Sequence, residues 1–307
     1  MTADRYLNQV SLLLRVIPEI APEVDFALKG GTAINLFVRD LPRLSVDIDL
    51  VYLPVADRET SLAAVHAGFE RIAQRLETRL GFKVDRHLLS YGKRLLVHFE
   101  SATIKVEISP VLRGTVFPPE IRAVSPAVEE RFGFAEMPVV SLPDLYAGKM
   151  AAALDRQHPR DLFDIHHLLE NEGVDDDLFR AFLIYLVSHP RPVHELLCPH
   201  RLEIAAQYDE EFVGMTVTPL PLDALLMARE ALIETVQRRA ADPAARRFLE
   251  SFVATEPDWP AIGLGDAIAE LPALRWKLMN LERLRQQNPD KFAGQAELLN
   301  QCLGRGS

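Results

Sequence analysis

Two aspartates alternate with aliphatic residues in the run VDIDLV, residues 46–51. A period of two is typical of a β-strand, in which successive side chains point to opposite faces. Asp47 and Asp49 therefore share one face, about 7 Å apart along the strand. Two carboxylates on one face of a mostly buried strand repel each other and are costly to desolvate. A divalent cation compensates both charges, and hard oxygen ligands favour Mg²⁺ or Mn²⁺.

A pair of glycines precedes these acids. Gly30 and Gly31 follow a short apolar run, residues 26–28, and lead into an amphipathic segment. Glycines between a strand and a helix leave backbone N–H groups accessible and allow a phosphate group to approach closely. Thr32 can cap the helix or donate a hydrogen bond to the same phosphate. A phosphate-binding turn followed by a metal-binding pair favours transfer chemistry on a nucleoside triphosphate (NTP).

Glu107 is the candidate for a third carboxylate. It lies in the alternating run TIKVEIS, residues 103–109, which places it on one face with Lys105 and the aliphatic residues on the other. The alternation predicts a strand. A plain surface pair of Lys105 and Glu107 on an edge strand is the alternative interpretation of the same pattern.

A second charged cluster lies in a helical stretch further along the chain. Lys149 and Arg156 fall on one face of the first helix, and Asp161 and Asp164 share a face one turn apart in the next. Lysine and arginine side chains suit the binding of triphosphate charge. The two aspartates, as residues N-cap and N3, are also suited to cap the second helix.

The elements that position these residues follow from the apolar periodicity. Helical and strand patterns are mixed up to residue 110, and beyond residue 141 the chain is almost entirely helical. A proline-rich stretch lies between them, so we expect two domains, residues 1–140 and 141–307. In the first part we expect helices at 4–17 and 57–80 and strands at 84–89, 94–100 and 103–109, with a hairpin turn at 90–93. In the second part we expect helices at 175–188, 222–240, 243–253 and 271–285. The chain end at 304–307 should be frayed.

Composition limits the class of protein. The chain has 307 residues, of which 48% are hydrophobic and 25% charged, as is typical of a soluble globular protein. A formal net charge of −10 argues against a uniformly basic nucleic-acid binder, although a local basic groove remains compatible. Cys198 and Cys302 form neither a disulfide framework nor a zinc quartet. With no run of 18 apolar residues and a charged N-terminal segment, we expect a cytoplasmic protein without a membrane anchor.

Taken together, the motifs resemble those of the AbiEii/AbiGii-type nucleotidyltransferases. These are toxin components of bacterial abortive-infection and type IV toxin–antitoxin pairs, in the polymerase-β-like superfamily. The resemblance rests on Gly-Gly-Thr-Ala at residues 30–33 and on the pattern Arg-x-Ser-x-Asp-x-Asp at residues 43–49. The family pattern also has a lysine on a helix followed by an Arg-Asp-Leu-x-Asp-like segment, which Lys149 and residues 160–164 match. The resemblance covers roughly residues 10 to 170.

The resemblance implies an α+β fold: a polymerase-β-like nucleotidyltransferase domain with a mixed sheet flanked by helices, followed by a helical C-terminal domain. It implies transfer of NMP from an NTP with release of pyrophosphate, and a third acid that completes the metal site or acts as general base. The C-terminal domain would contribute Lys149 and residues 160–164 to the cleft. The implied metal ligands are Asp47, Asp49 and Glu107. The implied catalytic residues are these three acids together with Lys149 and Asp164. The residues implied to bind the nucleotide are Gly30, Gly31, Thr32, Arg43, Ser45, Lys149, Arg160 and Asp161.

The resemblance also suggests partners. They are an NTP, an RNA acceptor with the 3′ end of tRNA as the expected site, and a cognate antitoxin encoded nearby, with growth arrest or aborted phage infection as the outcome. A nucleotidyltransferase acting on a small molecule, like the aminoglycoside-modifying enzymes, and a non-catalytic NTP-binding regulator are the alternatives. A basic rim formed by Arg71, Arg75 and Arg79 would favour RNA, but interleaved glutamates also fit a solvated helix face.

Three further features carry less information. Ser45 lies where related toxins have a serine at the nucleotide site that can be phosphorylated, and a hydrogen bond to backbone is its alternative role. His194, Cys198 and His200 lie near prolines and lack the fourth ligand of a typical metal site. Trp276 is expected in the core of the C-terminal domain.

Overall fold

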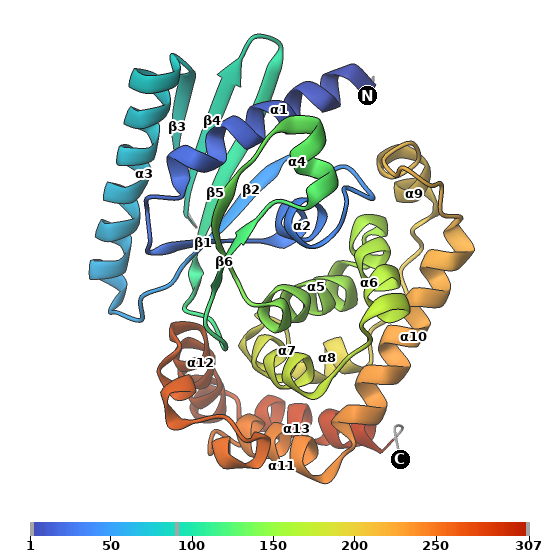
Figure 1. The fold of residues 1–307 in the computed structure, drawn as a ribbon. Coiled ribbons are helices and arrows are strands. Elements are labelled where there is room, and N and C mark those ends of the chain that lie inside the picture. Colours follow the sequence, from blue (N-terminus) through green and yellow to red (C-terminus); the bar gives the residue numbers. More distant parts are fainter. Residues whose placement is uncertain (1–2, 90–91, 305–307) are drawn as a thin grey trace. The chain divides into compact units, whose positions relative to one another are not determined.

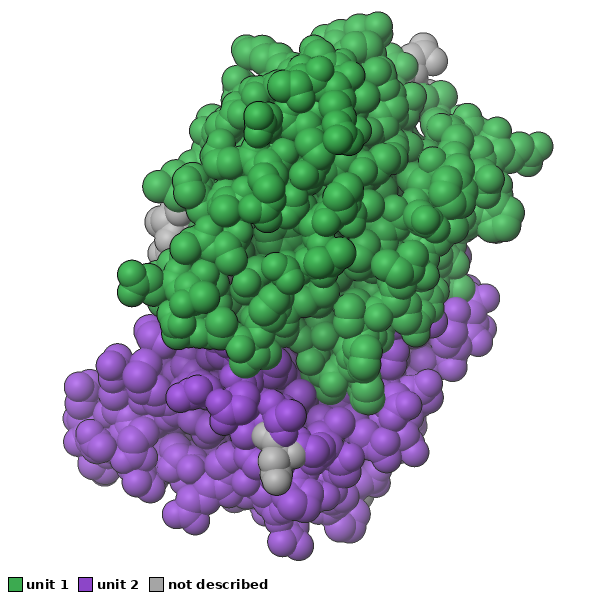
Figure 2. Space-filling view, turned by 60° about the vertical axis from the view of Figure 1, so that its left-hand side comes forward, with its two compact units in different colours: residues 1–141, 215–218 green, residues 142–214, 219–307 purple. Residues whose placement is uncertain are grey.

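The computed structural model describes residues 3–89 and 92–304 of the chain. The chain forms two compact units, shown in different colours in Figure 2. Unit 1 comprises residues 1–141 and 215–218, and unit 2 comprises residues 142–214 and 219–307. The segment 215–218, which the sequence interpretation assigned to the C-terminal domain, belongs to unit 1 because its backbone pairs with residues 42–44.

Unit 1 is built on a mixed seven-stranded sheet in the order β3-β4-β5-β2-β1-β7-β6 (Figure 1). The pairs β2–β5 and β1–β7 are parallel, and the other neighbouring strands are antiparallel. The strands are β1 (Phe26–Lys29), β2 (Asp47–Tyr52), β3 (Lys83–Leu89), β4 (Gly92–Phe99), β5 (Ala102–Arg113), β6 (Glu120–Ala123) and β7 (Glu136–Val139).

Two long helices of unit 1 pack on one face of this sheet. They are α1 (Ala3–Ile20), which contacts β5 and β7, and α3 (Arg58–Leu80), which contacts β3 and β4. Helix α3 begins after Asp57, whose carboxylate accepts a hydrogen bond from Thr60 N, and ends at Gly81 with a positive φ of 66°. The aliphatic residues of the central strands are buried beneath these helices. The remaining helices of unit 1 are α2 (Gly30–Ala33), which continues as a π-helical turn at Ile34–Val38, and α4 (Pro126–Phe132).

The arginine row on α3 serves the packing of these helices. The guanidinium groups of Arg71 and Arg75 lie 2.5 and 2.8 Å from the Glu23 carboxylate, and that of Arg79 lies 3.5 Å from Glu19. Acidic residues at the end of α1 and just after it neutralise these arginines, so the row does not form the basic rim that would have favoured RNA.

Unit 2 is helical, as expected. Its core contains large aromatic side chains, including Phe182, Phe248 and Phe252, but Trp276 is 56% exposed, so its expected core position is wrong. The helices are α5 (Leu142–Arg156), α6 (Pro159–Asn171), α7 (Asp176–Ser188), α8 (Val193–Leu197), α9 (Ala205–Glu211), α10 (Leu222–Ala240), α11 (Pro243–Val253), α12 (Pro272–Gln287) and α13 (Pro289–Leu303), with short 3₁₀ turns at Trp259–Ile262 and Asp266–Glu270.

Some expected boundaries differ from the structure. The proline-rich stretch between the two expected domains, residues 111–140, has regular structure: it contains the end of β5, then β6, α4 and β7. The expected turn at 90–93 lies partly outside the described residues, and Gly92 and Lys93 belong to β4. The frayed end at 304–307 also lies largely outside them. Within residues 3–89 and 92–304, no helix has the length and apolar character needed to cross a bilayer.

Candidate active site

The acids of unit 1 lie on the sheet face opposite α1 and α3. Strands β2 and β5 are parallel neighbours, and their register pairs Asp47 with Lys105 and Asp49 with Glu107. Residues that pair directly across neighbouring strands point to the same face. These four side chains are partly exposed, whereas Ile48 and the other alternating residues are buried. Glu107 therefore lies on the same face as the two aspartates.

Two cations accompany the acids on this face. Lys105 Nζ lies 3.0 Å from Asp47 Oδ2 and 4.0 Å from Glu107 Oε1. Arg94, which pairs with Glu107 across β4 and β5, donates a hydrogen bond from Nε to the Glu107 carboxylate. Strand β5 lies between β4 and β2, so the interpretation of Glu107 as part of a pair on an edge strand is wrong. The carboxylates are instead neutralised by cations from neighbouring positions of the sheet.

The glycine turn packs directly against the acids. Gly30 has a positive φ of 78°, and a Cβ built on it would lie 2.8 Å from Asp49 Oδ2. A Cβ on Gly31 would lie 2.7 Å from Arg43 Nη2 and 2.9 Å from Ser45 Oγ. Any larger residue at either position would have to displace a side chain of the motif. The two glycines are therefore required by the close approach of Asp49, Arg43 and Ser45.

Thr32 joins this turn to the acidic strand. Its buried hydroxyl donates a hydrogen bond of 2.5 Å to the Asp47 carbonyl oxygen and lies 3.0 Å from Ser45 Oγ. The N-cap of α2 is Lys29, so the expected capping role of Thr32 is wrong. The backbone N–H of Ser45 donates to the Tyr6 hydroxyl, and burial raises the pKa of Tyr6, which keeps that hydroxyl neutral. Both Thr32 and Ser45 thus help to fix the backbone next to Asp47.

Arg43 and Asn35 support the glycine turn from the other side. Arg43 is buried, and its Nη1 donates to the Leu44 carbonyl oxygen at 2.9 Å. Asn35 Nδ2 donates to the Gly31 carbonyl oxygen at 2.8 Å, while Asn35 Oδ1 accepts from Arg43 N at 3.3 Å. The sequence interpretation missed Asn35. The feature of the sequence that could have indicated Asn35 is its single amide side chain within the apolar run INLFV, because a buried polar group needs hydrogen-bond partners.

In unit 2, the predicted lysine contacts both predicted aspartates. Lys149 Nζ lies 2.8 Å from Asp161 Oδ1 and 3.0 Å from Asp164 Oδ2, and all three side chains are buried. Arg156 donates two further hydrogen bonds to Asp161, at 2.5 and 3.0 Å. Burial raises the pKa of Asp161, but the charges of Lys149 and Arg156 outweigh it and hold this pKa well below its usual range. Asp161 therefore stays ionised and holds the lysine ammonium.

Helix α6 begins before Asp161, the residue that the capping interpretation placed at its N-terminus. Its N-cap is His158, whose Nδ1 accepts a hydrogen bond from Arg160 N at 3.2 Å. Asp161 is residue N3 and binds Lys149 and Arg156, so the interpretation of Asp161 as the cap is wrong. Arg160 is partly exposed, and its guanidinium forms no hydrogen bond or ion pair with a residue that the structure describes. Its charge helps to lower the pKa of the nearby Glu211 carboxylate, while its N–H groups remain available to a ligand.

The comparisons with known proteins agree with these motifs. The chain matches the model of a family described as "Nucleotidyl transferase AbiEii toxin, Type IV TA system" over residues 11–280. The chain belongs to this family. It is therefore a nucleotidyltransferase toxin of a type IV toxin–antitoxin system, which implies an NTP substrate and a cognate antitoxin. The match extends well beyond residue 170, where the motif resemblance was expected to end.

The fold also agrees with a solved structure. MenT4, a nucleotidyltransferase toxin from Mycobacterium tuberculosis H37Rv, superposes with a TM-score of 0.57 at 19% sequence identity. The alignment covers 91% of this chain and 95% of MenT4. No curated protein matches the chain in sequence. The likeness to MenT4 confirms the expected fold of a mixed sheet with flanking helices and a helical C-terminal region.

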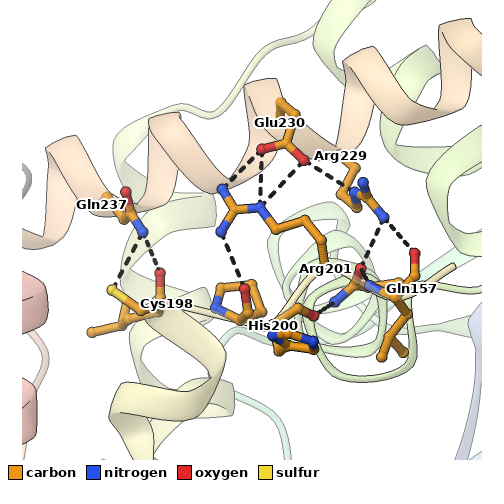
Figure 3. A network of polar contacts seen from close by, with 10 residues as sticks. Gln157, Cys198, His200, Arg201, Arg229, Glu230 and Gln237 are labelled. Carbon is orange, nitrogen blue, oxygen red and sulfur yellow. Dashed lines mark hydrogen bonds and ion pairs between the residues drawn. The ribbon is translucent and has the colours of Figure 1, made fainter.

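A polar network in unit 2 of the toxin fixes the turn that precedes α6 (Figure 3). Gln157 is buried with a positive φ of 49°, and its Nε2 donates to the His200 carbonyl oxygen at 2.7 Å. Gln157 Oε1 accepts hydrogen bonds from Leu202 N at 3.0 Å and Arg229 Nη1 at 3.2 Å. Glu230 in turn accepts from Arg229 and Arg201. The network holds the residue that follows Arg156 and so helps to position the Lys149–Asp161 contact.

Asp47, Asp49 and Glu107, which were expected to bind a metal ion together, are not gathered into a three-acid site. Among the residues that the structure describes, no three His, Cys, Asp or Glu side chains gather closely enough to hold a metal. Cys198 Sγ accepts a hydrogen bond from Gln237 at 3.4 Å and belongs to the network of Figure 3. Mg²⁺ commonly binds through one or two carboxylates together with substrate phosphates and waters. The partly exposed pair Asp47 and Asp49 fits that mode of binding.

Proposed function

We propose that the toxin transfers NMP from an NTP to an RNA acceptor, at the 3′ end of tRNA, and releases pyrophosphate. The observation that carries the proposal is the shared face of Asp47, Asp49 and Glu107 beside the glycine turn at residues 30–31. Carboxylates next to a turn with close backbone access suit a triphosphate bound together with a divalent cation. The family supports the reaction class, and the geometry of unit 1 supports these residues as its machinery.

Asp47 and Asp49 would hold Mg²⁺ or Mn²⁺, which would neutralise charge on the reacting phosphate. Glu107 would accept the proton of the attacking hydroxyl, as a general base. The Arg94 contact holds the Glu107 carboxylate in place on this face of the sheet. Glu107 would exchange this contact for the hydroxyl of the acceptor.

The glycine turn would bind the triphosphate. Backbone N–H groups of Gly30 and Gly31 would donate hydrogen bonds to its oxygens, because the glycines carry no side chain of their own. Arg43 and Ser45 border Gly31 and would contribute charge and a hydroxyl. The Thr32 hydroxyl is engaged with Asp47, so Thr32 would act by positioning that strand.

Lys149 and Arg160 of unit 2 would act on the nucleotide as cations, as the family pattern implies. Lys149 contacts Asp161 and Asp164, and these two carboxylates fix the direction of its side chain. Arg160 has a guanidinium available for phosphate and would add a second charge. We propose catalytic roles for Lys149 and Asp164, and nucleotide-binding roles for Arg160 and Asp161. These roles rest on the family pattern and on the contacts within unit 2.

The acceptor is the least constrained part of the proposal. Arg71, Arg75 and Arg79 pair with acidic residues and offer no basic rim, so RNA as the acceptor rests on the family alone. Modification of tRNA ends would arrest growth in the cytoplasm, where NTP and tRNA are available. The same outcome would abort phage infection, and the cognate antitoxin would prevent it.

Incubation with each labelled NTP, Mg²⁺ and total RNA tests the proposal. We expect label in an RNA of tRNA size, and we expect Asp49→Ala to reduce it at least about 100-fold without loss of folding. Full activity of Asp49→Ala would overturn the assignment of the acids. Label only in a small molecule would favour the aminoglycoside-like reaction, and no transfer to any acceptor would favour an NTP-binding regulator.

A further inference from the structure

Lys105 lies beside the acid pair, although it is outside the motifs on which the resemblance to the family rests. It pairs with Asp47 in the register of β2 and β5, and its side chain is on the same face. Its Nζ is 3.0 Å from Asp47 and 4.0 Å from Glu107. An ammonium group thus contacts one of the two carboxylates proposed to bind the metal and lies near the third acid.

We propose that Lys105 is an exchangeable counter-ion of the metal site. It neutralises Asp47 when no metal is bound, and it releases this carboxylate to a divalent cation that arrives with the triphosphate. The inference rests on the proposed function, because it requires Asp47 and Asp49 to be metal ligands.

Because Lys105 is partly exposed, breaking its ion pair with Asp47 costs little free energy. The side chains of Lys105 and Asp47 are 41% and 40% exposed, and exposed ion pairs of this type contribute little to stability. The flexible four-carbon stem allows the ammonium to turn away without moving the strand. Lys149 is different, because it is buried between two buried aspartates and its displacement would leave uncompensated charges. Lys105 is therefore the lysine suited to move.

The Lys105 ammonium acts on Asp47, one of the two aspartates proposed to bind the metal. The Asp49 carboxylate packs against the Gly30 backbone, whereas the Lys105 ammonium pairs with Asp47. The backbone of Asp47 is held by Thr32, so its position does not depend on the lysine. Removal of the ammonium frees Asp47 Oδ2 while the strand stays in place.

Lys105 should weaken binding of the metal ion alone and strengthen binding of the triphosphate. As a cation it competes with a divalent ion for Asp47, so it weakens binding of the metal alone. Once displaced, the ammonium remains on the face where the triphosphate would bind, and it attracts that anion. A side chain with a purely structural role would change both affinities in the same direction or neither.

Mn²⁺ binding to the full chain, measured from the electron paramagnetic resonance signal of free Mn²⁺, tests this inference. The metal is titrated alone and then with inorganic triphosphate, which all NTPs share. We expect Lys105→Met to bind Mn²⁺ alone about 3- to 5-fold more tightly than the wild type. We expect its affinity for triphosphate in the presence of Mn²⁺ to fall by at least about 3-fold. Lys105→Arg keeps the charge and should resemble the wild type more closely.

Lys83→Met is the matched control. Lys83 Nζ lies 3.8 Å from Asp85 Oδ1 on the edge strand β3 of the same sheet, so this variant loses the same charge from a similar pair. It should change either affinity by less than about 1.5-fold, because a distant exposed charge is screened by salt. A comparable change in Lys83→Met and Lys105→Met would show a net-charge effect and overturn the inference.

Asp49→Ala separates the two proposals. If it abolishes Mn²⁺ binding while Lys105→Met binds Mn²⁺ no more tightly than the wild type, the counter-ion role is wrong and the metal site stands. If Asp49→Ala and the wild type bind Mn²⁺ alike, the proposed metal site is wrong and the role of Lys105 is overturned with it. Circular dichroism of each variant verifies that the fold is retained.

Discussion

Lys149 Nζ lies 2.8 Å from Asp161 Oδ1, and this contact joins α5 to α6 across the turn formed by Gln157 and His158. Both side chains are buried, so the contact brings two charges out of water together. Such a pair is stable only when each charge is compensated, and Asp164 and Arg156 complete the compensation. The site lysine is therefore also part of the structure of unit 2.

We expect Lys149→Met to destabilise the protein as well as abolish transfer. Asp161 and Asp164 would lose the ammonium that contacts them both, and the free energy of unfolding should fall by about 3–5 kcal/mol. Arg156→Met is the matched control, since Arg156 is 60% exposed and Asp161 keeps Lys149. It should cost about 1 kcal/mol. Urea unfolding of both variants measures the difference, and equal losses would contradict the central role of Lys149.

Gly30→Ala should impair catalysis by displacing Asp49. The new Cβ would lie 2.8 Å from Asp49 Oδ2, and alanine at a φ of 78° costs about 1–2 kcal/mol. Gly81→Ala is the matched control, because Gly81 has a φ of 66° and open space within 4 Å of the place that a Cβ would occupy. Both variants should lose similar stability in thermal unfolding, but only Gly30→Ala should lose transfer activity, by at least about 10-fold. Equal activity in the two variants would remove Gly30 from the site.

Arg229→Met should loosen the turn that precedes α6. Arg229 is buried and donates to Gln157 Oε1 and, at 2.9 Å, to the Leu202 carbonyl oxygen, so the variant leaves buried acceptors without this donor. We expect the free energy of unfolding to fall by about 2–3 kcal/mol. Arg201→Met removes the exposed partner of Glu230 and should cost less than about 1 kcal/mol. Chemical denaturation distinguishes the two, and the reverse order would contradict the network's role.

Lys277 should make stability depend on pH. Its Nζ donates to the carbonyl oxygens of His189 and Arg191 at 2.6 and 2.7 Å, and burial lowers the pKa of Lys277 to about 8. An unfolded lysine has a pKa of about 10.4. Between these values the unfolded chain binds a proton that the folded chain has released, so stability rises with pH by up to about 1.4 kcal/mol per unit.

The Lys277→Met variant isolates this contribution. Its free energy of unfolding, compared with that of the wild type at pH 7.5, 8.5 and 9.5, should show a wild-type advantage that grows across this range. Below about pH 8 both states hold the proton and the difference should be flat. A constant difference up to pH 9.5 would mean that the carbonyl acceptors keep Lys277 charged in the folded protein.

The sequence by itself determined the local features of the site. The alternation at residues 46–51 and 103–109 specified strands and the faces of Asp47, Asp49 and Glu107, because backbone geometry imposes a period of two. The glycine pair marked a position where a side chain does not fit. The helical spacing of Lys149, Asp161 and Asp164 was likewise readable, since these residues are close along the chain.

The tertiary structure decided which charges meet. The contacts of Lys105 with Asp47 and of Arg94 with Glu107 depend on which strands pair and in what register, and no local pattern specifies that. The ion pair of Arg71 with Glu23 and the hydrogen bond of Arg229 to Gln157 join residues that are far apart in sequence. Long-range packing brings such groups together, and it alone determines whether a charged side chain is free to bind a ligand or is already neutralised by the protein.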